Sequence, residues 1–412
     1  AVGKAVQVYL LPHRRCHRPV AKVAAVEIPA QVGRQKQALT VGRAAVAAFA
    51  VANPHPAMAV EVQLPSGTPK VVQVTHRNLI AAARGTIAVR PMAGDDVYLY
   101  PFPLCHVAGY NLVMFHHEAR PVVLARQFTP ASLVHEIEAH RVTTVSLAPT
   151  MIHQLVEHLD GAVTSGALGS LRAVTYGSSS ISPTLLRRAI DVLGADFHQG
   201  YGMTELSGNA VFLSPADHRR GLDGEPHLLA SAGRPGPAVE LRLLDDRGDD
   251  VPEGAVGEIA VQGEQVTAGY WEAPEVDAET FVDGWLRTGD LGRIHDGYLT
   301  VVDRKKDIIV TGGENVSSRF VEDALVTHPD VAEVAVVGAP DARWGEVVCA
   351  FVVPRAGSGL TEADVVEHGR RAIGGFQQPR RAVLVDELPR NATGKVTKPT
   401  LRASLAAPDP QG

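Results

Sequence analysis

The amino-acid sequence predicts an α/β protein with a large first domain and a small α+β domain at its C-terminal end. From about residue 71 to residue 302, short apolar runs alternate with amphipathic helical patterns. Residues 143–147 and 171–175 have the composition of buried strands, and residues 130–140 and 183–193 have the pattern of helices. Strands that alternate with helices favour a layered architecture. The length of 412 residues also exceeds one ordinary core, so two domains are expected.

The pattern changes twice in the second half of the chain. Around residues 238–261, short runs punctuated by Gly, Pro and Asp indicate antiparallel strands joined by turns. After Asp303 comes a unit of about 100 residues, which is enough for a small domain. The elements predicted in these two parts are strands at residues 239–244 and 258–261, a helix at 319–326, strands at 331–337 and 347–353, and a helix at 361–373.

Composition argues against several kinds of partner and location. Lys and Arg number 39 against 45 Asp and Glu, so the net charge of −6 gives no reason to expect nucleic acid or an anionic membrane surface. No apolar segment of the sequence reaches the roughly 18 residues that a membrane span needs. Cys16, Cys105 and Cys349 are too scattered for a metal cluster or a disulfide framework, and a reducing cytoplasm is therefore expected.

Three clusters rich in glycine and hydroxyl groups are candidates for contact with phosphate. Residues 66–70 read Ser-Gly-Thr-Pro-Lys, although a plain surface turn explains this cluster better when it is taken alone. Residues 176–180 directly follow a predicted strand, and α/β sheets bind ligands at the C-terminal ends of their strands. Residues 199–205 combine an aromatic ring, a hydroxyl and a carboxylate, and Mg²⁺ takes such a carboxylate together with substrate phosphates.

Four further charged or glycine-containing segments follow. They are residues 285–290, 303–307, 311–315 and 389–395, and the last of them presents a lysine on a glycine-containing loop. Each segment alone is explained as a charged turn. That explanation does not account for their joint order along the chain.

In this order the motifs resemble those of the adenylate-forming superfamily, which includes acyl-CoA synthetases, firefly-type luciferases and peptide-synthetase adenylation domains. The resemblance extends from about Val74 to Arg402. Besides the clusters above, it includes residues 74–79, 101–106, 148–150 and 232–235. It implies a large domain of layered α/β subdomains with a β-rich portion, followed by a small mobile α+β lid domain.

The resemblance implies a nucleotide site made from several of these clusters. Tyr201 and the backbone of residues 177–180 would flank adenine. Asp290 would bind the ribose hydroxyls, supported by Arg304. The full set of nucleotide-binding residues that it implies is Ser66, Gly67, Thr68, Lys70, Gly177, Ser178, Ser179, Tyr201, Gly202, Asp290 and Arg304.

Catalysis, by the same resemblance, would rest on Lys395, Thr204 and Glu205. Lys395 would bridge the substrate carboxylate and the α-phosphate of ATP, and Thr204 would contact the α-phosphate. Glu205 would hold Mg²⁺. A lysine and a divalent cation offset the repulsion between two anions that must meet, and such electrostatic stabilisation is usually the largest catalytic effect.

The resemblance also implies a second, thiol-binding site and a hinge. Lys306 occupies the hinge position between the domains. The implied coenzyme A contacts are Gly312, Gly313, Glu314 and, as a weaker candidate, Trp344, while His106 would line the acyl pocket. A lid that rotates about the hinge could present Lys395 for the first step and the glycine-containing loop for the second.

The chain departs from the family pattern at its phosphate loop. The family loop reads Ser-Gly-Thr-Thr-Gly-x-Pro-Lys, but here Thr68 joins Pro69 directly and Val71 replaces a usual glycine. Fewer amides and hydroxyls therefore remain to hold the β- and γ-phosphates.

The start of the chain matches no motif. The sequence begins at Ala1 rather than Met, and residues 1–60 are predicted to be a truncated or divergent N-terminal region. The remaining divisions predicted are an adenylation core at 61–302, a hinge at 303–306 and a lid domain at 307–412.

Three functional hypotheses remain open. The first is an ATP-dependent acyl-CoA ligase for a fatty or other apolar carboxylic acid, because residues 312–318 resemble the acyl-CoA ligase branch. The second is a catalytically impaired relative that binds nucleotide or acyl ligands. The third is an adenylation domain that loads a carrier protein. The ligase hypothesis requires ATP, Mg²⁺ and coenzyme A, and no nucleic acid.

Overall fold

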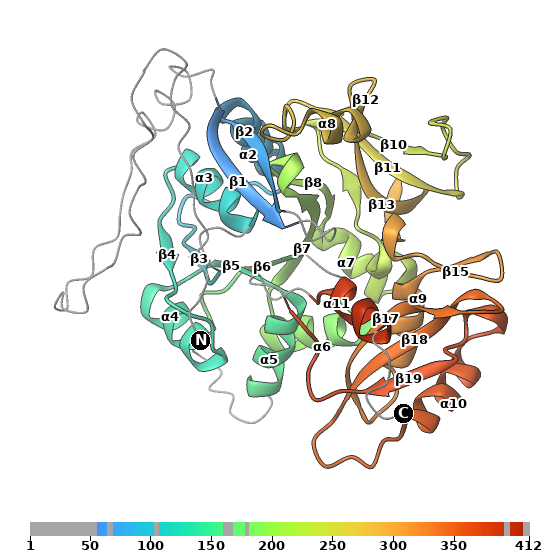
Figure 1. Ribbon diagram of the computed structural model, residues 1–412. Helices are drawn as coiled ribbons and strands as arrows, with labels where there is room; N and C mark the ends of the chain where they lie inside the picture. Colours follow the sequence, from blue (N-terminus) through green and yellow to red (C-terminus); the bar gives the residue numbers. More distant parts are fainter. Residues whose placement is uncertain are drawn as a thin grey trace, which may run out of the picture.

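The structure is a computed structural model that describes residues 56–63, 69–102, 107–159, 168–177, 181–390 and 396–406. Within these residues the strands form four sheets, and helices accompany the largest of them (Figure 1). The predicted α/β class, with a large N-terminal part and a smaller α+β part at the C-terminal end, is confirmed.

The largest sheet has seven strands, in the order β4-β3-β5-β6-β7-β8-β9. The first five strands in this order run parallel, β8 pairs antiparallel with β7, and β9 pairs antiparallel with β8. The strands are β3 (Tyr98–Tyr100), β4 (Val122–Leu124), β5 (Thr144–Leu147), β6 (Ala173–Gly177), β7 (Asp196–Met203), β8 (Gly208–Leu213) and β9 (Arg234–Pro235). The predicted strand at 171–175 is thus real, but it begins two residues later and ends at Gly177.

Two helical layers cover this sheet. Leu99 of β3 belongs to a core with α4, α5 and α6, whereas its neighbours Tyr98 and Tyr100 pack with α2 and α3. Because alternate residues of a strand point to opposite faces, the sheet is buried on both sides. The helices of this part are α2 (His76–Val89), α3 (Tyr110–His117), α4 (Pro130–His140), α5 (Pro149–Leu159), α6 (Pro183–Leu193) and α7 (Pro215–Leu222), with short 3₁₀ helices η1 (Val107–Gly109), η2 (Thr204–Leu206) and η3 (Pro226–Ala230).

Helices α4 and α6 have the bounds that the sequence predicts, because both ends carry local signals. Each begins with proline in its first turn, where the missing N–H costs nothing. The side chains of Thr129 and Ser182 cap the two N-termini. At the C-terminal ends, Arg141 and Gly194 adopt the left-handed conformation that closes a helix.

Two further sheets are antiparallel. The predicted strand at Val239–Leu244 forms with its predicted bounds, and its predicted partner is longer than residues 258–261. The larger sheet contains β10 (Val239–Leu244), β11 (Val256–Gly263), β12 (Phe281–Val282), β13 (Trp285–His295) and β14 (Tyr298–Arg304), accompanied by α8 (Pro274–Thr280). The smaller sheet pairs β1 (Pro56–Gln63) with β2 (Pro69–Thr75), and the sequence analysis did not predict it.

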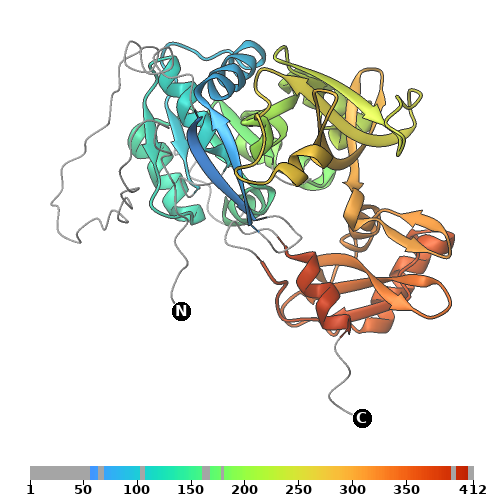
Figure 2. The same cartoon turned by 45° about the horizontal axis from the view of Figure 1, so that its top comes forward.

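The C-terminal elements form their own sheet and core. The buried residues Ile309, Val321, Val336, Val348 and Ala350 pack together there, and Figure 2 shows these elements in orange and red on one side of the molecule. The elements are β15 (Ile309–Thr311), β16 (Glu314–Val316), α9 (Ser318–Leu325), β17 (Val331–Asp341), β18 (Gly345–Pro354), α10 (Glu362–Ala372), η5 (Gly375–Gln377), β19 (Arg381–Leu384) and α11 (Lys398–Ala406).

The predicted elements of this C-terminal part are all present. The helices predicted at 319–326 and 361–373 form as α9 and α10, with each end within one residue of its predicted position. The strands predicted at 331–337 and 347–353 are both longer than predicted, because the β17–β18 ladder continues to the pair of Asp341 and Gly345.

The segment that joins the two parts is held from both sides. Lys305 Nζ lies 3.3 Å from Glu258 Oε2 of β11, and Arg402 Nη2 of α11 lies 2.8 Å from Asp307 Oδ1. One turn, η4 (Lys305–Asp307), carries Lys306 between these two attachments. The predicted hinge therefore lies where a contact to the large part gives way to a contact within the C-terminal part, and the boundaries at 303–306 stay a prediction.

Limited trypsin digestion is expected to cut first at Arg304, Lys305 or Lys306 and to release a C-terminal piece of about 100 residues. The contacts of a segment about which two domains rotate must break and re-form, so it opens more readily than the cores on either side. Mass spectrometry of the fragments over time measures this. Cleavage concentrated elsewhere between residues 61 and 412, with this segment resistant, would contradict a mobile lid.

Candidate functional site

The C-terminal ends of β6 and β7 bring two of the predicted clusters together. Gly177 pairs with Gly200 across the parallel strands. Tyr201 and Gly202 follow on β7, and the chain then turns through η2, which begins at Thr204. A Cβ on Gly202 would meet the backbone of the facing strand β8, so only glycine allows β7 and β8 to approach this closely.

Tyr201, Asp290 and Arg304 lie side by side, although they are far apart in the sequence. The Tyr201 hydroxyl donates to Asp290 Oδ2 at 2.8 Å, and Arg304 Nε lies 3.5 Å from Asp290 Oδ1. The pairing of β13 with β14 places Asp290 opposite Arg304. Burial, followed by the Asp290 carboxylate, raises the pKa of the Tyr201 hydroxyl well above its ordinary value. This group combines an aromatic ring, against which a base can stack, with a fixed carboxylate, which can accept hydrogen bonds from the two hydroxyls of a ribose.

Glu205 is a buried carboxylate with little compensation from the protein. Its exposed fraction is 1%, and the Tyr270 hydroxyl donates to its Oε1 at 2.8 Å. Among the described residues no lysine, arginine or histidine forms an ion pair with it. Lys70 Nζ lies 5.5 Å from the centre of the Tyr270 ring. A buried carboxylate with one neutral donor fits a divalent cation, which prefers such oxygen ligands.

The predicted coenzyme A residues meet in the C-terminal part. Gly312, in the left-handed conformation at φ 61°, donates from its backbone N to the Trp344 carbonyl at 2.8 Å, and a Cβ on it would lie 2.7 Å from the Trp344 ring. Gly313 follows, and Glu314 begins β16 with an exposed side chain. The guanidinium groups of Arg343 and Arg380 lie 4.9 Å and 4.6 Å from the Trp344 ring centre.

Lys306 lies at the junction of the two parts, and its side chain remains partly exposed. Its partial burial, followed by the nearby charge of Arg304, lowers the pKa of its ammonium group to about 8. Arg402 donates to the Lys306 carbonyl at 3.3 Å. Lys306 therefore lies close enough to Asp290 and Arg304 for their charges to act on its ammonium group, and its hinge role stays a prediction.

A cavity of about 210 Å³ opens beside Gly177 and Gly200. Its lining includes the apolar side chains of Leu147, Phe212 and Leu213. It also includes Gln199 of the 199–205 cluster and polar residues outside the predicted clusters, namely Arg90, Asn111, Ser146, Thr175, His198 and Asn209.

Sequence reasoning missed two kinds of residue here. Tyr270, the partner of Glu205, follows Gly269 in a stretch that carries no hydroxyl or charge cluster, so only the fold connects it to residue 205. Arg90 and His198 line the cavity, although Arg90 follows an ordinary helix and His198 precedes the 199–205 cluster. No local signal in the sequence marks any of the three.

Several predicted site residues lie outside the described part of the chain. They are Ser66, Gly67, Thr68, His106, Ser178, Ser179 and Lys395. Their roles stay predictions from the resemblance.

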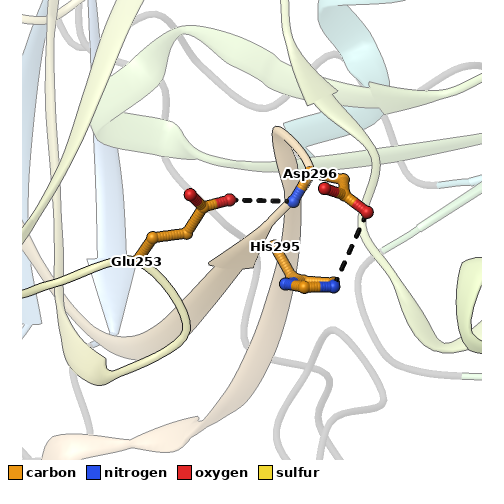
Figure 3. Close-up of side chains that lie close together, drawn as sticks. All are labelled: Glu253, His295 and Asp296. Carbon is orange, nitrogen blue, oxygen red and sulfur yellow. Dashed lines mark hydrogen bonds and ion pairs between the residues drawn. The ribbon is translucent and has the colours of Figure 1, made fainter.

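Glu253, His295 and Asp296 form a separate exposed group at the turn between β13 and β14 (Figure 3). Glu253 Oε1 accepts from the Asp296 backbone N at 3.1 Å, and His295 Nε2 lies 3.6 Å from Asp296 Oδ2. These contacts support a hairpin turn in which Asp296 has φ 49°. All three residues are exposed, and the group is not part of the candidate site.

None of the described helices has both the length and the apolar character needed to cross a bilayer.

Family models match two parts of the chain. The model described as AMP-binding enzyme matches residues 49–271, and the model described as AMP-binding enzyme C-terminal domain matches residues 321–395. Together they include Gly177, Tyr201 and Glu205 in the first match and Trp344 and Lys395 in the second.

Curated relatives are similar over most of this chain. A medium/long-chain-fatty-acid–CoA ligase of Mycobacterium tuberculosis is 37% identical over 82% of this chain and 59% of its own length. A fatty acid–[acyl-carrier-protein] ligase of Streptomyces coeruleorubidus is 37% identical over 82% of this chain and 65% of its own length. An indoleacetate–CoA ligase of Aromatoleum aromaticum is 38% identical over 83% of this chain and 66% of its own length. The chain thus spans less than two thirds of the length of these relatives.

Solved structures share the fold. The amide bond synthetase McbA from Marinactinospora thermotolerans is 36% identical, with a TM-score of 0.74 over 82% of this chain and 68% of that one. The o-succinylbenzoate coenzyme A synthetase from Bacillus subtilis was solved in complex with ATP and a magnesium ion. It is 30% identical, with a TM-score of 0.75 over 85% of this chain and 69% of that one.

Proposed function

The chain belongs to the AMP-binding enzyme family, and on that premise we propose that it is an ATP-dependent acid–thiol ligase. It activates a carboxylic acid as an acyl adenylate and transfers the acyl group to coenzyme A. The observation that supports this proposal most is the contact of Tyr201 with Asp290 and of Asp290 with Arg304, together with the buried carboxylate of Glu205 in the same 199–205 segment as Tyr201.

The first step joins two anions. An oxygen of the substrate carboxylate attacks the α-phosphorus of ATP, a new C–O–P linkage forms, and pyrophosphate leaves. Tyr201 and Asp290 would orient the nucleoside for in-line attack, and Thr204 would contact the α-phosphate. Mg²⁺, when bound at Glu205, supplies positive charge that offsets the phosphate charges. Lys395 would place an ammonium group between the two reacting anions.

The second step uses the activated carbonyl. The sulfur of coenzyme A attacks it, the thioester bond forms, and AMP leaves with the electron pair of the C–O bond. We propose that the C-terminal part turns about Lys306 between the steps, which would carry Lys395 away and bring Gly312, Gly313 and Glu314 to the thiol. Trp344, packed against Gly312, would help to hold this loop in shape.

The kind of carboxylic acid that the protein activates depends on the lining of the cavity. The sequence analysis predicts a fatty or other apolar acid, and the side chains of Leu147, Phe212 and Leu213 in the cavity support an apolar body. The relatives act on acids of different kinds according to their names, including fatty acids and indoleacetate. The cytoplasmic location predicted from the cysteines stays a prediction.

Acid-dependent ATP–pyrophosphate exchange tests the proposal directly. Exchange with at least one member of a broad panel of acids, followed by thioester formation with coenzyme A, is the expected result. Silence of a folded protein across the panel would favour the impaired relative. Acylation of a phosphopantetheinyl carrier protein in preference to free coenzyme A would favour the carrier-loading alternative, which the Streptomyces relative gives reason to include.

Lengthening the phosphate loop is expected to speed the first step. Inserting Thr-Gly-Ser between Thr68 and Pro69 restores amide and hydroxyl donors for the leaving pyrophosphate. Each regained charge-assisted bond contributes roughly 1.5–3 kcal/mol, so exchange should rise at least about tenfold. An insert of the same length made of three alanines is the matched control, because it lengthens the loop without adding hydroxyls. No gain over the wild-type protein in a folded Thr-Gly-Ser variant would mean that the missing residues do not limit the reaction. An equal gain in the alanine insert would assign the effect to the backbone amides alone.

A further inference from the structure

A buried guanidinium lines the cavity beside the candidate site. Arg90 caps the C-terminal end of α2, and only 9% of its surface is exposed. Its Nη2 lies 3.4 Å from Asn111 Oδ1 and 3.6 Å from Met114 Sδ, and both distances are long for a charged donor. Among the described residues, nothing accepts a hydrogen bond from Arg90 Nε. The protein therefore leaves much of the five-donor guanidinium unsatisfied.

No carboxylate of the described residues neutralises Arg90 by direct contact. The nearest acidic influence comes from Asp96, but its carboxylate already accepts hydrogen bonds from Ala93 N at 2.7 Å, Thr143 Oγ1 at 2.7 Å and Arg172 Nη2 at 2.6 Å. Burial lowers the pKa of Arg90, and it outweighs the opposing influences of nearby tyrosines and Asp96. A buried, unpaired charge is costly, so a partner from a ligand would stabilise this site.

Several other polar groups beside Arg90 form hydrogen bonds with one another. Asn111 Nδ2 donates to Ser146 Oγ at 3.3 Å, and Ser146 Oγ lies 2.6 Å from Thr175 Oγ1 and 2.7 Å from the Tyr98 hydroxyl. This chain of hydrogen bonds fixes the cavity wall. Among the described residues of that wall, the Arg90 guanidinium and the Tyr110 hydroxyl keep unused hydrogen-bonding capacity, and of these two only Arg90 carries a charge.

His198 adds a neutral polar group to the same cavity. Burial, followed by the charge of Arg90, lowers the pKa of the His198 imidazole to about 3, so it is uncharged at neutral pH. It does not add a second positive charge that a ligand would have to neutralise. Two other charged side chains also line the cavity: Asp217, which contacts the Tyr298 hydroxyl and Arg220, and Arg234, which lies over the Tyr298 ring. One anionic group beside Arg90 would therefore balance the charge of the buried guanidinium.

We infer that the acid activated by this protein carries a second carboxylate, which pairs with Arg90 inside the cavity. This inference rests on the proposed function and names the class of acid: a compact dicarboxylic acid. A carboxylate can accept two parallel hydrogen bonds from a guanidinium, whereas the methyl end of a fatty acid would leave the charge buried and unpaired. The apolar lining suits the carbons between the two carboxylates, and about 210 Å³ suits a short chain of about four to eight carbons.

Matched pairs of acids test the inference. ATP–pyrophosphate exchange is measured with α,ω-dicarboxylic acids and with monocarboxylic acids of the same carbon number, hexanedioate against hexanoate among them. The wild-type protein is expected to prefer the diacid at least about tenfold in kcat/KM. Arg90→Met should lose about 100-fold with the diacid and little with the monoacid. Arg188→Met, which removes an exposed arginine paired with Glu157, is the control and should behave as wild type.

Two further measurements keep the inference separate from folding and from the proposed function. If Arg90→Met does not fold, Arg90→Lys serves as the second variant, because lysine keeps the charge but cannot form the bidentate pair of hydrogen bonds. Its kcat/KM with the diacid should still fall at least about tenfold. Calorimetric binding of hexanedioate and hexanoate without ATP reports on the cavity even when no acid is activated.

The outcomes divide clearly. A wild-type preference for monoacids, or an unchanged ratio in Arg90→Met, overturns the inference and leaves the ligase proposal standing. Diacid binding that depends on Arg90, with no exchange for any acid, supports the pairing of a ligand carboxylate with Arg90 and overturns the ligase proposal. If the protein shows no diacid binding and no exchange, both the inference and the ligase proposal are overturned.

Discussion

Replacing Lys395 by alanine is expected to lower acid-dependent ATP–pyrophosphate exchange by a factor of about 10²–10³ and to leave thioester formation nearly unchanged. In the first step a carboxylate approaches a phosphate, and an ammonium group between them is worth several kcal/mol in a site that excludes water. In the second step the carbonyl is already activated, and the lid is expected to have carried Lys395 away. Exchange measures the first step, and supplied acyl-AMP with coenzyme A measures the second.

The second half-reaction is also the control for folding in this experiment. A Lys395→Ala protein that still converts acyl-AMP to thioester has an intact fold and an intact thiol site. Lys395→Arg, which keeps the charge but changes its position, should recover only part of the exchange. Equal slowing of both half-reactions in a folded Lys395→Ala protein would mean that the lid does not alternate as proposed.

Glu205→Gln is expected to reduce exchange about 100-fold and to raise the Mg²⁺ concentration that the reaction needs. The substitution keeps the shape of the side chain, which is 1% exposed, but it removes the charge that a divalent cation requires. The loss should appear in both the rate and the metal dependence, because the amide oxygen is a weaker ligand. Exchange measured across a series of Mg²⁺ concentrations tests this.

Tyr270→Phe is the matched control for Glu205→Gln. It removes only the hydroxyl that donates to Glu205 at 2.8 Å and leaves the carboxylate in place. We expect it to lower exchange by about tenfold, because one hydrogen bond to a charged group contributes roughly 1.5–3 kcal/mol and water can replace part of it. The shift in melting temperature on adding Mg²⁺ and ATP should persist in Tyr270→Phe and shrink in Glu205→Gln. An unchanged Mg²⁺ dependence in Glu205→Gln would remove Glu205 as the metal ligand.

The candidate site divides into residues that motifs reveal and residues that they do not. Tyr201, Glu205, Asp290 and Arg304 lie in motifs whose order along the chain is informative, so the sequence alone identifies them as candidate site residues. The structure brings Tyr201, Asp290 and Arg304 together as the resemblance implies. Their functional roles stay predictions until they are measured.

The sequence by itself determined the fold class and the helices with strong end signals. Proline in the first turn, a Thr or Ser cap and a left-handed closing residue are local features, so α4 and α6 form with the predicted bounds. Strands were less well defined. β17 and β18 extend past their apolar runs because backbone hydrogen bonds between neighbouring strands do not depend on the side-chain pattern.

Only the tertiary structure decided which side chains share a cavity or a charge. Tyr270 lies 65 positions from Glu205, and Asn111 lies 21 positions from Arg90, yet each pair is in contact. The charge on a buried group depends on partners that the fold supplies from distant segments, and no local pattern records that one is missing. The family resemblance therefore predicts an apolar acid, whereas our inference of an acid with a second carboxylate rests on Arg90, which has no ion-pair partner among the described residues of the folded cavity.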